Sequence, residues 1–177
     1  TVEKSNKGKS RIVGHALKQL IDQSKKIFIM GHANPDMDSF GSALGITRLC
    51  VLCEKEPYLV IDEVNESLQE IFRQAKESDN YQFISSEKAV SLADEESLLI
   101  VTDTHRPSLV QCPELLKICE RIVVVDHHRK MEECIENPVL AYMESYASSA
   151  SELVAEMLQY MISKKSLNKL EAEALLA

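Results

Sequence analysis

Short, uninterrupted apolar runs are the feature that most limits what this chain can fold into. The clearest are 27–30 (IFIM), 98–101 (LLIV) and 122–125 (IVVV). Runs this short are typical of strands covered on both faces, and such strands occur in parallel sheets. Segments with helical spacing of apolar residues separate them, which favours right-handed strand–helix–strand crossovers. We therefore predict an α/β fold: a three-layer, open, mostly parallel sheet with helices on both faces.

The other elements are predicted from apolar spacing and helix-start residues. The first helix carries an apolar stripe that includes Ile12, the second has Ser39 as its N-cap, and Ser149 with Glu152 fits a capping box. The same Ser149 region could instead face a phosphate from a helix N-terminus. The predicted helices are 10–23, 39–53, 66–76, 113–120, 149–163 and from 167 onward; the predicted strands are 27–30, 58–61, 82–84, 98–102, 121–125 and 139–143.

Length and composition fit one domain without a duplex nucleic-acid partner. With 177 residues, 45% of them hydrophobic, the chain has material for one ordinary core. We expect 1–9 to be a linker and 10–177 to form the domain. The net charge of -8 argues against duplex DNA or RNA. No apolar run approaches the roughly 20 residues of a membrane span, and the five cysteines lack disulfide-scaffold spacing, so we expect a soluble cytoplasmic domain without direct membrane contact.

Acidic and histidine side chains follow three of the predicted strands. In open α/β sheets, ligands bind where the carboxyl ends of the strands meet, so we expect one shared cleft. A lone Asp at such a position is usually a turn or cap residue, but the joint pattern favours a site. The residues are His32, Asp36 and Asp38 in GHANPDMDS (31–39), Asp103 after the strand 98–102, and Asp126, His127 and His128 after the strand 121–125.

These side chains suit a pair of divalent cations. Carboxylates favour hard ions, and an added imidazole favours manganese over magnesium. We predict that His32, Asp36 and Asp103 hold one ion, that Asp38 and His127 hold a second, and that Asp103 bridges the two. Paired ions activate water and neutralise phosphoryl charge, so the predicted reaction class is phosphoester hydrolysis.

Cationic side chains flank the predicted ligands. His105 follows Asp103, and Arg129 follows His128. Arg129 or His128 could bind a phosphate oxygen or assist proton transfer. The alternative is that Arg129 merely balances a carboxylate-rich loop.

The motifs H-x-N-P-D-x-D-S, Asp-Thr-His and Asp-His-His together resemble those of the DHH phosphoesterase family. The stretches GHANPDMDSFGSALG, VTDTHRPSLVQCPEL and VVVDHHRK are most similar to the family's cyclic-di-AMP phosphodiesterases. The resemblance implies the N-terminal domain fold of the family, two Mn²⁺ ions on the ligands above, and hydrolysis of cyclic di-AMP to pApA. It further implies catalytic roles for Asp126 and His128, substrate contacts from Arg129 and His105, a parent protein anchored in the bacterial cell membrane and a homodimer.

Two features of the resembled family are missing from these residues. Its second metal takes a further Asp from a segment like G-I-x-x-D-T, and a glycine-rich DHH-associated domain closes over the substrate. We expect both to follow Ala177, so the domain here would be truncated and weakly active or inactive by itself. Three alternatives stay open: another family substrate (pyrophosphate, polyphosphate or short oligoribonucleotides), a non-catalytic metal-binding module, or a non-catalytic nucleotide-binding module.

Overall fold

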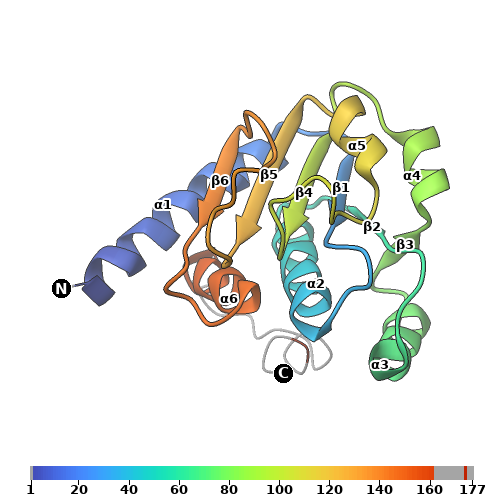
Figure 1. Ribbon diagram of the computed structural model, residues 1–177, viewed down its shortest axis with the longest axis horizontal. Helices are drawn as coiled ribbons and strands as arrows, with labels where there is room; N and C mark the ends of the chain where they lie inside the picture. The colour runs from blue at the N-terminus through green and yellow to red at the C-terminus, as the bar shows by residue number, and fades with distance from the viewer. Residues whose placement is uncertain (1, 162–173, 175–177) are drawn as a thin grey trace.

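Figure 1 shows a single parallel sheet between helices in the computed structural model, which describes residues 2–161 and residue 174, with side chains from residue 8 onward. Six strands pair in the order β3-β2-β1-β4-β5-β6, and every pair is parallel. The strands are β1 (Ile27–Met30), β2 (Tyr58–Val60), β3 (Gln82–Ile84), β4 (Leu98–Thr102), β5 (Arg121–Asp126) and β6 (Leu140–Met143). The helices are α1 (Val2–Asp22), α2 (Met37–Leu52), α3 (Glu66–Glu77), α4 (Ser86–Leu92), α5 (Pro113–Ile118) and α6 (Ala150–Met161). The predicted α/β class is confirmed.

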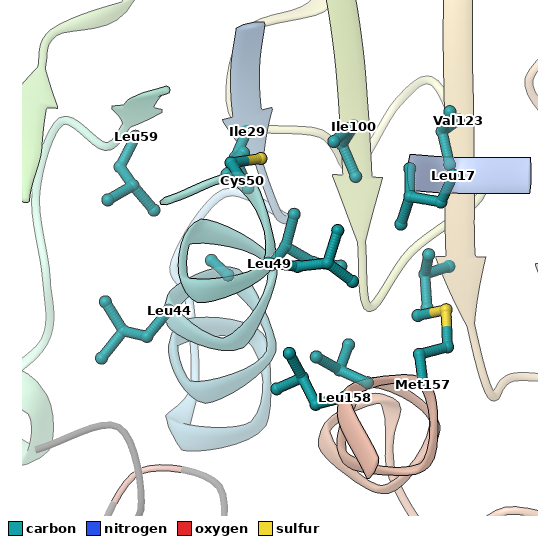
Figure 2. Close-up of a cluster of buried hydrophobic side chains, with 14 of the residues drawn as sticks. Leu17, Ile29, Leu44, Leu49, Cys50, Leu59, Ile100, Val123, Met157 and Leu158 are labelled. Atoms are coloured by element: carbon teal, nitrogen blue, oxygen red, sulfur yellow. The ribbon is translucent and has the colours of Figure 1, made fainter. Parts of the chain in front are cut away.

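The two faces of the sheet are covered by different helices. Helices α1, α2, α3 and α6 contribute to one buried cluster, and α4 and α5 contribute to the other. Successive strand residues point to opposite faces, so Ile29 joins the first cluster while Phe28 joins the second. Figure 2 shows Ile29, Ile100 and Val123 on the strands, on the side of the sheet where Leu49 of α2 and Met157 of α6 lie. This double covering explains why the strands have continuous apolar sequences.

The first helix differs from its prediction in two ways. It begins at Val2 rather than at residue 10, so residues 2–9, expected to be a linker, are helical. Its buried stripe runs through Val13, Leu17 and Ile21, and this leaves Ile12 72% exposed. Residues four apart share a helix face, whereas Ile12 lies about 100° away from Val13.

The starts of two later helices also correct the sequence analysis. Asp36, not Ser39, caps α2: its Oδ1 accepts a hydrogen bond of 2.8 Å from the Ser39 N–H. At α6, Ser149 accepts from the Glu152 N–H as a capping box requires, but the Glu152 carboxylate accepts from the Ser148 N–H instead of closing on Ser149.

One helix of the structure was not predicted, and one predicted helix cannot be compared with the structure. The short helix α4 was not predicted, because its seven residues hold too few apolar positions for a periodic signal. The predicted helix from 167 onward falls outside the described residues. Within the part that is described, no helix combines the length and apolarity needed to cross a bilayer.

The strand order reverses between β1 and β4. From β1 the chain builds outward to β2 and β3, then returns to place β4 on the other side of β1. At such a reversal the loops after the two strands diverge to opposite faces and leave a crevice at their carboxyl ends. The segment with His32 leaves β1 at this point, and Asp103 follows β4.

Shortening Ile100 to Ala should destabilise the domain strongly. This side chain is fully buried on the central strand β4, and a large-to-small change there removes apolar contacts and leaves a cavity. We expect the free energy of unfolding in urea to fall by about 2–5 kcal/mol. The matched control Ile12→Ala, on the exposed side of α1, should change it by less than about 0.5 kcal/mol. Equal effects of the two changes would refute the assigned core.

Candidate metal centre

Asp103 lies at the centre of the predicted site. It follows β4, is 2% exposed and has a φ of 62°, a left-handed conformation unusual for a residue with a side chain. Its Oδ2 lies 3.2 Å from His32 Nε2, and its Oδ1 lies 3.3 Å from His127 Nε2. One carboxylate therefore stands between an imidazole that follows β1 and an imidazole that follows β5.

The Oδ1 atom of Asp103 is buried and has no hydrogen-bond partner among the described residues. A buried carboxylate oxygen without a donor is costly, and such atoms in native proteins usually have a specific explanation. A divalent cation supplies one here, because it would bind the free oxygen and offset the negative charge. The residues present thus fit a metal ion.

The first predicted ligand set comes together in the fold. His32, Asp36 and Asp103 each offer a ligand atom, and these atoms lie within 4.8 Å of one another. His32 Nε2 is 3.7 Å from Asp36 Oδ1, while His32 Nδ1 is 3.0 Å from the carbonyl oxygen of Ala33. A proton on Nδ1, donated to that carbonyl, leaves Nε2 available for a metal. Asp36 thus combines helix capping with a position in the site.

The second predicted set, Asp38, His127 and Asp103, also comes together, and a helix N-terminus positions Asp38. Asp38 Oδ2 lies 3.6 Å from His127 Nε2, close to Asp103. The Asp38 carboxylate accepts hydrogen bonds from the backbone N–H groups of Ala150 (2.9 Å) and Ser151 (2.8 Å) at the start of α6. The N-terminus of α6 therefore holds Asp38. From the sequence, this helix start could face a phosphate, but its contact with Asp38 was not predicted.

Asp126 holds the backbone of His127 and the imidazole ring of His128 beside the site. It is fully buried, and its Oδ1 accepts from the His127 N–H at 2.8 Å and lies 2.7 Å from His128 Nδ1. Its Oδ2 lies 2.7 Å from His105 Nδ1. Asp126 and His128 also fall with Asp103 and His127 in a second group whose ligand atoms lie within 4.8 Å of one another. The crowded hydrogen bonding of Asp126 suits a residue that orients its neighbours.

His105, also expected to contact substrate, is held by hydrogen bonds within the protein. The side chain is 2% exposed, and both ring nitrogens are engaged. Nε2 accepts a hydrogen bond of 3.0 Å from the Met131 N–H, so Nδ1 carries the proton that is donated to Asp126. Hydrogen bonds at both ring nitrogens suit a residue that positions Asp126 and the loop at Met131; His105 also lines the cleft, and its contact with substrate stays a prediction.

Electrostatics favour a cation in this cluster. Burial raises the pKa of Asp103 to about 6; the hydrogen bond from His32 opposes this rise, and the charges of Asp38 and Asp36 add to it. The hydrogen bond to Asp103 raises the pKa of His32 to about 9, although burial opposes it. Burial would raise the pKa of Asp38, but the hydrogen bonds from Ser151 and Ala150 outweigh it and lower that pKa. In the metal-free protein the positive charge of protonated His32 therefore offsets part of the negative charge of Asp103, as a metal ion would.

A cleft of about 570 Å³ at the carboxyl edge of the sheet is lined by His32, Asp36, Asp103, Asp126 and His128, but not by Asp38 or His127. His128 is 54% exposed, and the exposed Arg129 lies beside it on the cleft wall; its contact with substrate stays a prediction. The sequence analysis missed Glu133, whose carboxylate accepts from Arg106 Nη2 (3.1 Å) and from the Ser108 N–H (2.9 Å). No motif marks Glu133; only the folded loop brings it to this wall.

The fold is a parallel α/β sheet, and the carboxylates and imidazoles gathered at its switch point form a cluster that could hold a divalent metal ion. The model of the DHH family, N-terminal domain, matches residues 26–177, and the chain belongs to that family.

Known proteins that resemble the chain agree with this assignment. It is 42% identical to the cyclic-di-AMP phosphodiesterase GdpP of Bacillus subtilis over 99% of its own length and 27% of that protein. It is 30% identical to a probable manganese-dependent inorganic pyrophosphatase of Streptococcus thermophilus over 71% of its length and 39% of that protein. The crystal structure of an exopolyphosphatase-related protein from Bacteroides fragilis shares the fold, with a TM-score of 0.73 and 20% identity over 93% of this chain and 48% of that one.

Manganese binding should release protons near neutral pH. In the metal-free protein His32 is protonated below a pKa of about 9, whereas a metal requires its neutral Nε2. At pH 7.5 we expect about one proton released per ion bound at this set, and a weaker apparent affinity as the pH falls. Titration calorimetry in buffers of different ionisation enthalpy measures the release. Binding without proton release, or equal release from a His32→Ala variant, would contradict this account of the site.

Proposed function

We propose that this chain is the catalytic lobe of a manganese-dependent phosphodiesterase that hydrolyses cyclic di-AMP to the linear dinucleotide pApA. The observation that carries the proposal is the buried Oδ1 of Asp103, which has no hydrogen bond among the described residues and lies between the two imidazole-bearing strand ends. A likeness to GdpP of B. subtilis, named as a cyclic-di-AMP phosphodiesterase, extends over nearly the whole chain and supports the substrate.

Two Mn²⁺ ions would divide the ligands as the distances suggest. His32, Asp36 and Asp103 would hold one, and Asp38, Asp103 and His127 the other. When bound, such ions activate a water for in-line attack and neutralise charge on the phosphoryl group. The chain's own contribution is to hold the ligands in place: α6 fixes Asp38 through two backbone N–H groups.

His128 is the side chain best placed for proton transfer. With its Nδ1 at Asp126, 2.7 Å away, its Nε2 is left for the cleft, where the ring is 54% exposed. Asp126 keeps this tautomer, and His105 holds Asp126 from the other side. In its imidazolium form, with a second proton on Nε2, His128 would donate that proton to the leaving ribose oxygen and return to this neutral tautomer, and Asp126 would orient the ring.

Cationic groups on the cleft wall suit the phosphate. Arg129 is exposed in the cleft, and Arg106 lies on the same wall with one guanidinium nitrogen held by Glu133. An anchored guanidinium loses less side-chain freedom when it binds a non-bridging phosphate oxygen. We assign Arg129 to substrate binding, with Arg106 beside it.

A second candidate function is hydrolysis of pyrophosphate. It is favoured by the likeness to a protein named as a probable manganese-dependent inorganic pyrophosphatase, though over a smaller part of this chain. The same ligand set would serve either substrate, since both reactions displace an oxygen at phosphorus.

The chain spans 27% of the length of the GdpP relative. What is proposed next therefore concerns the whole parent protein. We propose a cytoplasmic position for this domain and a membrane anchor elsewhere in the parent protein, on the resemblance to cyclic-di-AMP phosphodiesterases. The domain itself would contact a cyclic dinucleotide rather than duplex nucleic acid. A homodimer is proposed for the parent protein.

The direct test is product formation by the full-length parent protein. With Mn²⁺ we expect cyclic di-AMP to be converted to pApA, and Asp103→Ala to reduce turnover by at least about 10³-fold because it removes the shared ligand. Asp22→Ala, at the far end of α1 where the carboxylate pairs with Lys18, is the matched control and should retain activity. Chromatography of the products distinguishes the candidates. Turnover of pyrophosphate in place of cyclic di-AMP would establish the second function, and full activity of the Asp103 variant would refute both.

A further inference from the structure

Two large apolar side chains stand in the wall of a cleft that also holds carboxylates, histidines and arginines. Leu109 is 43% exposed and Met131 is 50% exposed, and both line the cleft that holds Asp103 and His128. Scattered exposed apolar residues need no explanation, but a pair beside a catalytic cluster favours a ligand surface. Neither residue takes part in the chemistry proposed above.

The backbone at both positions is tied to the site. Leu109 accepts a hydrogen bond of 2.7 Å from the Ala33 N–H through its carbonyl oxygen, and the next residue, Val110, pairs with His32 in an isolated antiparallel bridge. On the other side the Met131 N–H donates to His105 Nε2 at 3.0 Å. These contacts fix the backbone at Leu109 and Met131 relative to the ligand cluster. A bound ligand therefore spends little free energy on ordering these two residues.

We propose that Leu109 and Met131 form a subsite for the flat face of a nucleobase, an inference that rests on the proposed function. A dinucleotide presents a charged phosphate and an uncharged, planar base, and the two need different surroundings. The carboxylate and histidine cluster with its ions suits the phosphate, whereas a branched aliphatic side chain and a polarisable thioether suit the base. Pyrophosphate would leave this surface uncovered, so the subsite selects nucleotide-bearing phosphoesters.

Two small ligands isolate the contribution of the base. AMP and ribose 5-phosphate share a sugar phosphate and differ in the adenine, and their binding to the 177-residue chain with Mn²⁺ can be measured by calorimetry without any turnover. We expect AMP to bind about tenfold or more tightly than ribose 5-phosphate. The double change Leu109→Ala with Met131→Ala should weaken AMP binding about tenfold and leave ribose 5-phosphate unchanged.

A matched control removes similar apolar surface elsewhere. Val90 is 36% exposed on α4 and Val139 is 49% exposed before β6, and neither lines the cleft. Val90→Ala with Val139→Ala should leave both affinities unchanged, and thermal unfolding of each double variant verifies its fold.

The outcomes separate this inference from the proposed function. Equal affinity for the two ligands, binding of neither, or an unchanged AMP affinity in the Leu109 and Met131 variant would overturn the subsite, whatever the parent protein hydrolyses. A base-dependent affinity lost in that variant would establish the subsite, even if cyclic di-AMP proved not to be the substrate.

Discussion

The parallel pairing of β1 with β4 is the constraint on which the candidate site depends. It aligns Met30 with Val101, so the chain leaves both strands at the same level of the sheet, where the strand order reverses. His32 and Asp103 each lie two residues after this pair, so the register brings them together. A slip of one residue would turn the side chains of one strand to the opposite face and separate them. Space is tight at this exit: a Cβ on Gly31 would lie 2.0 Å from Ser39 Oγ, so a side chain there would push against the start of α2.

The site gathers negative charge that the fold compensates only in part. Asp38 receives two backbone N–H groups from α6, and Asp126 is surrounded by the donors of His127, His128 and His105. Asp103, the most central carboxylate, has no hydrogen bond to its Oδ1 among the described residues and an unfavourable backbone conformation. Strain and unmet polar groups that persist at one place in a well-packed domain are typical of functional sites. A bound cation would resolve both the charge and the missing partner at Asp103.

The strands and their ends could be predicted because burial on both faces imposes continuous apolar runs and parallel pairing brings their carboxyl ends together. Local choices could not. Asp36 and Ser39 are both good N-caps, and only the folded backbone decides between them, because Asp36 is extended while Ser39 lies inside the helix. His105 follows Asp103 like a cleft residue, yet its ring turns inward because buried Asp126 needs a donor. The donors to Asp38 come from more than a hundred positions along the chain, a separation that no local pattern reports.

Anomalous diffraction from crystals of this chain soaked in Mn²⁺ tests the central claim most directly, because it locates manganese independently of any assay. The account predicts two peaks that share the Asp103 carboxylate, one beside His32 and Asp36 and the other beside His127 and Asp38, the second with the lower occupancy. Peaks that avoid Asp103, or a manganese ion bound elsewhere while this cluster stays empty at saturating concentration, would contradict it.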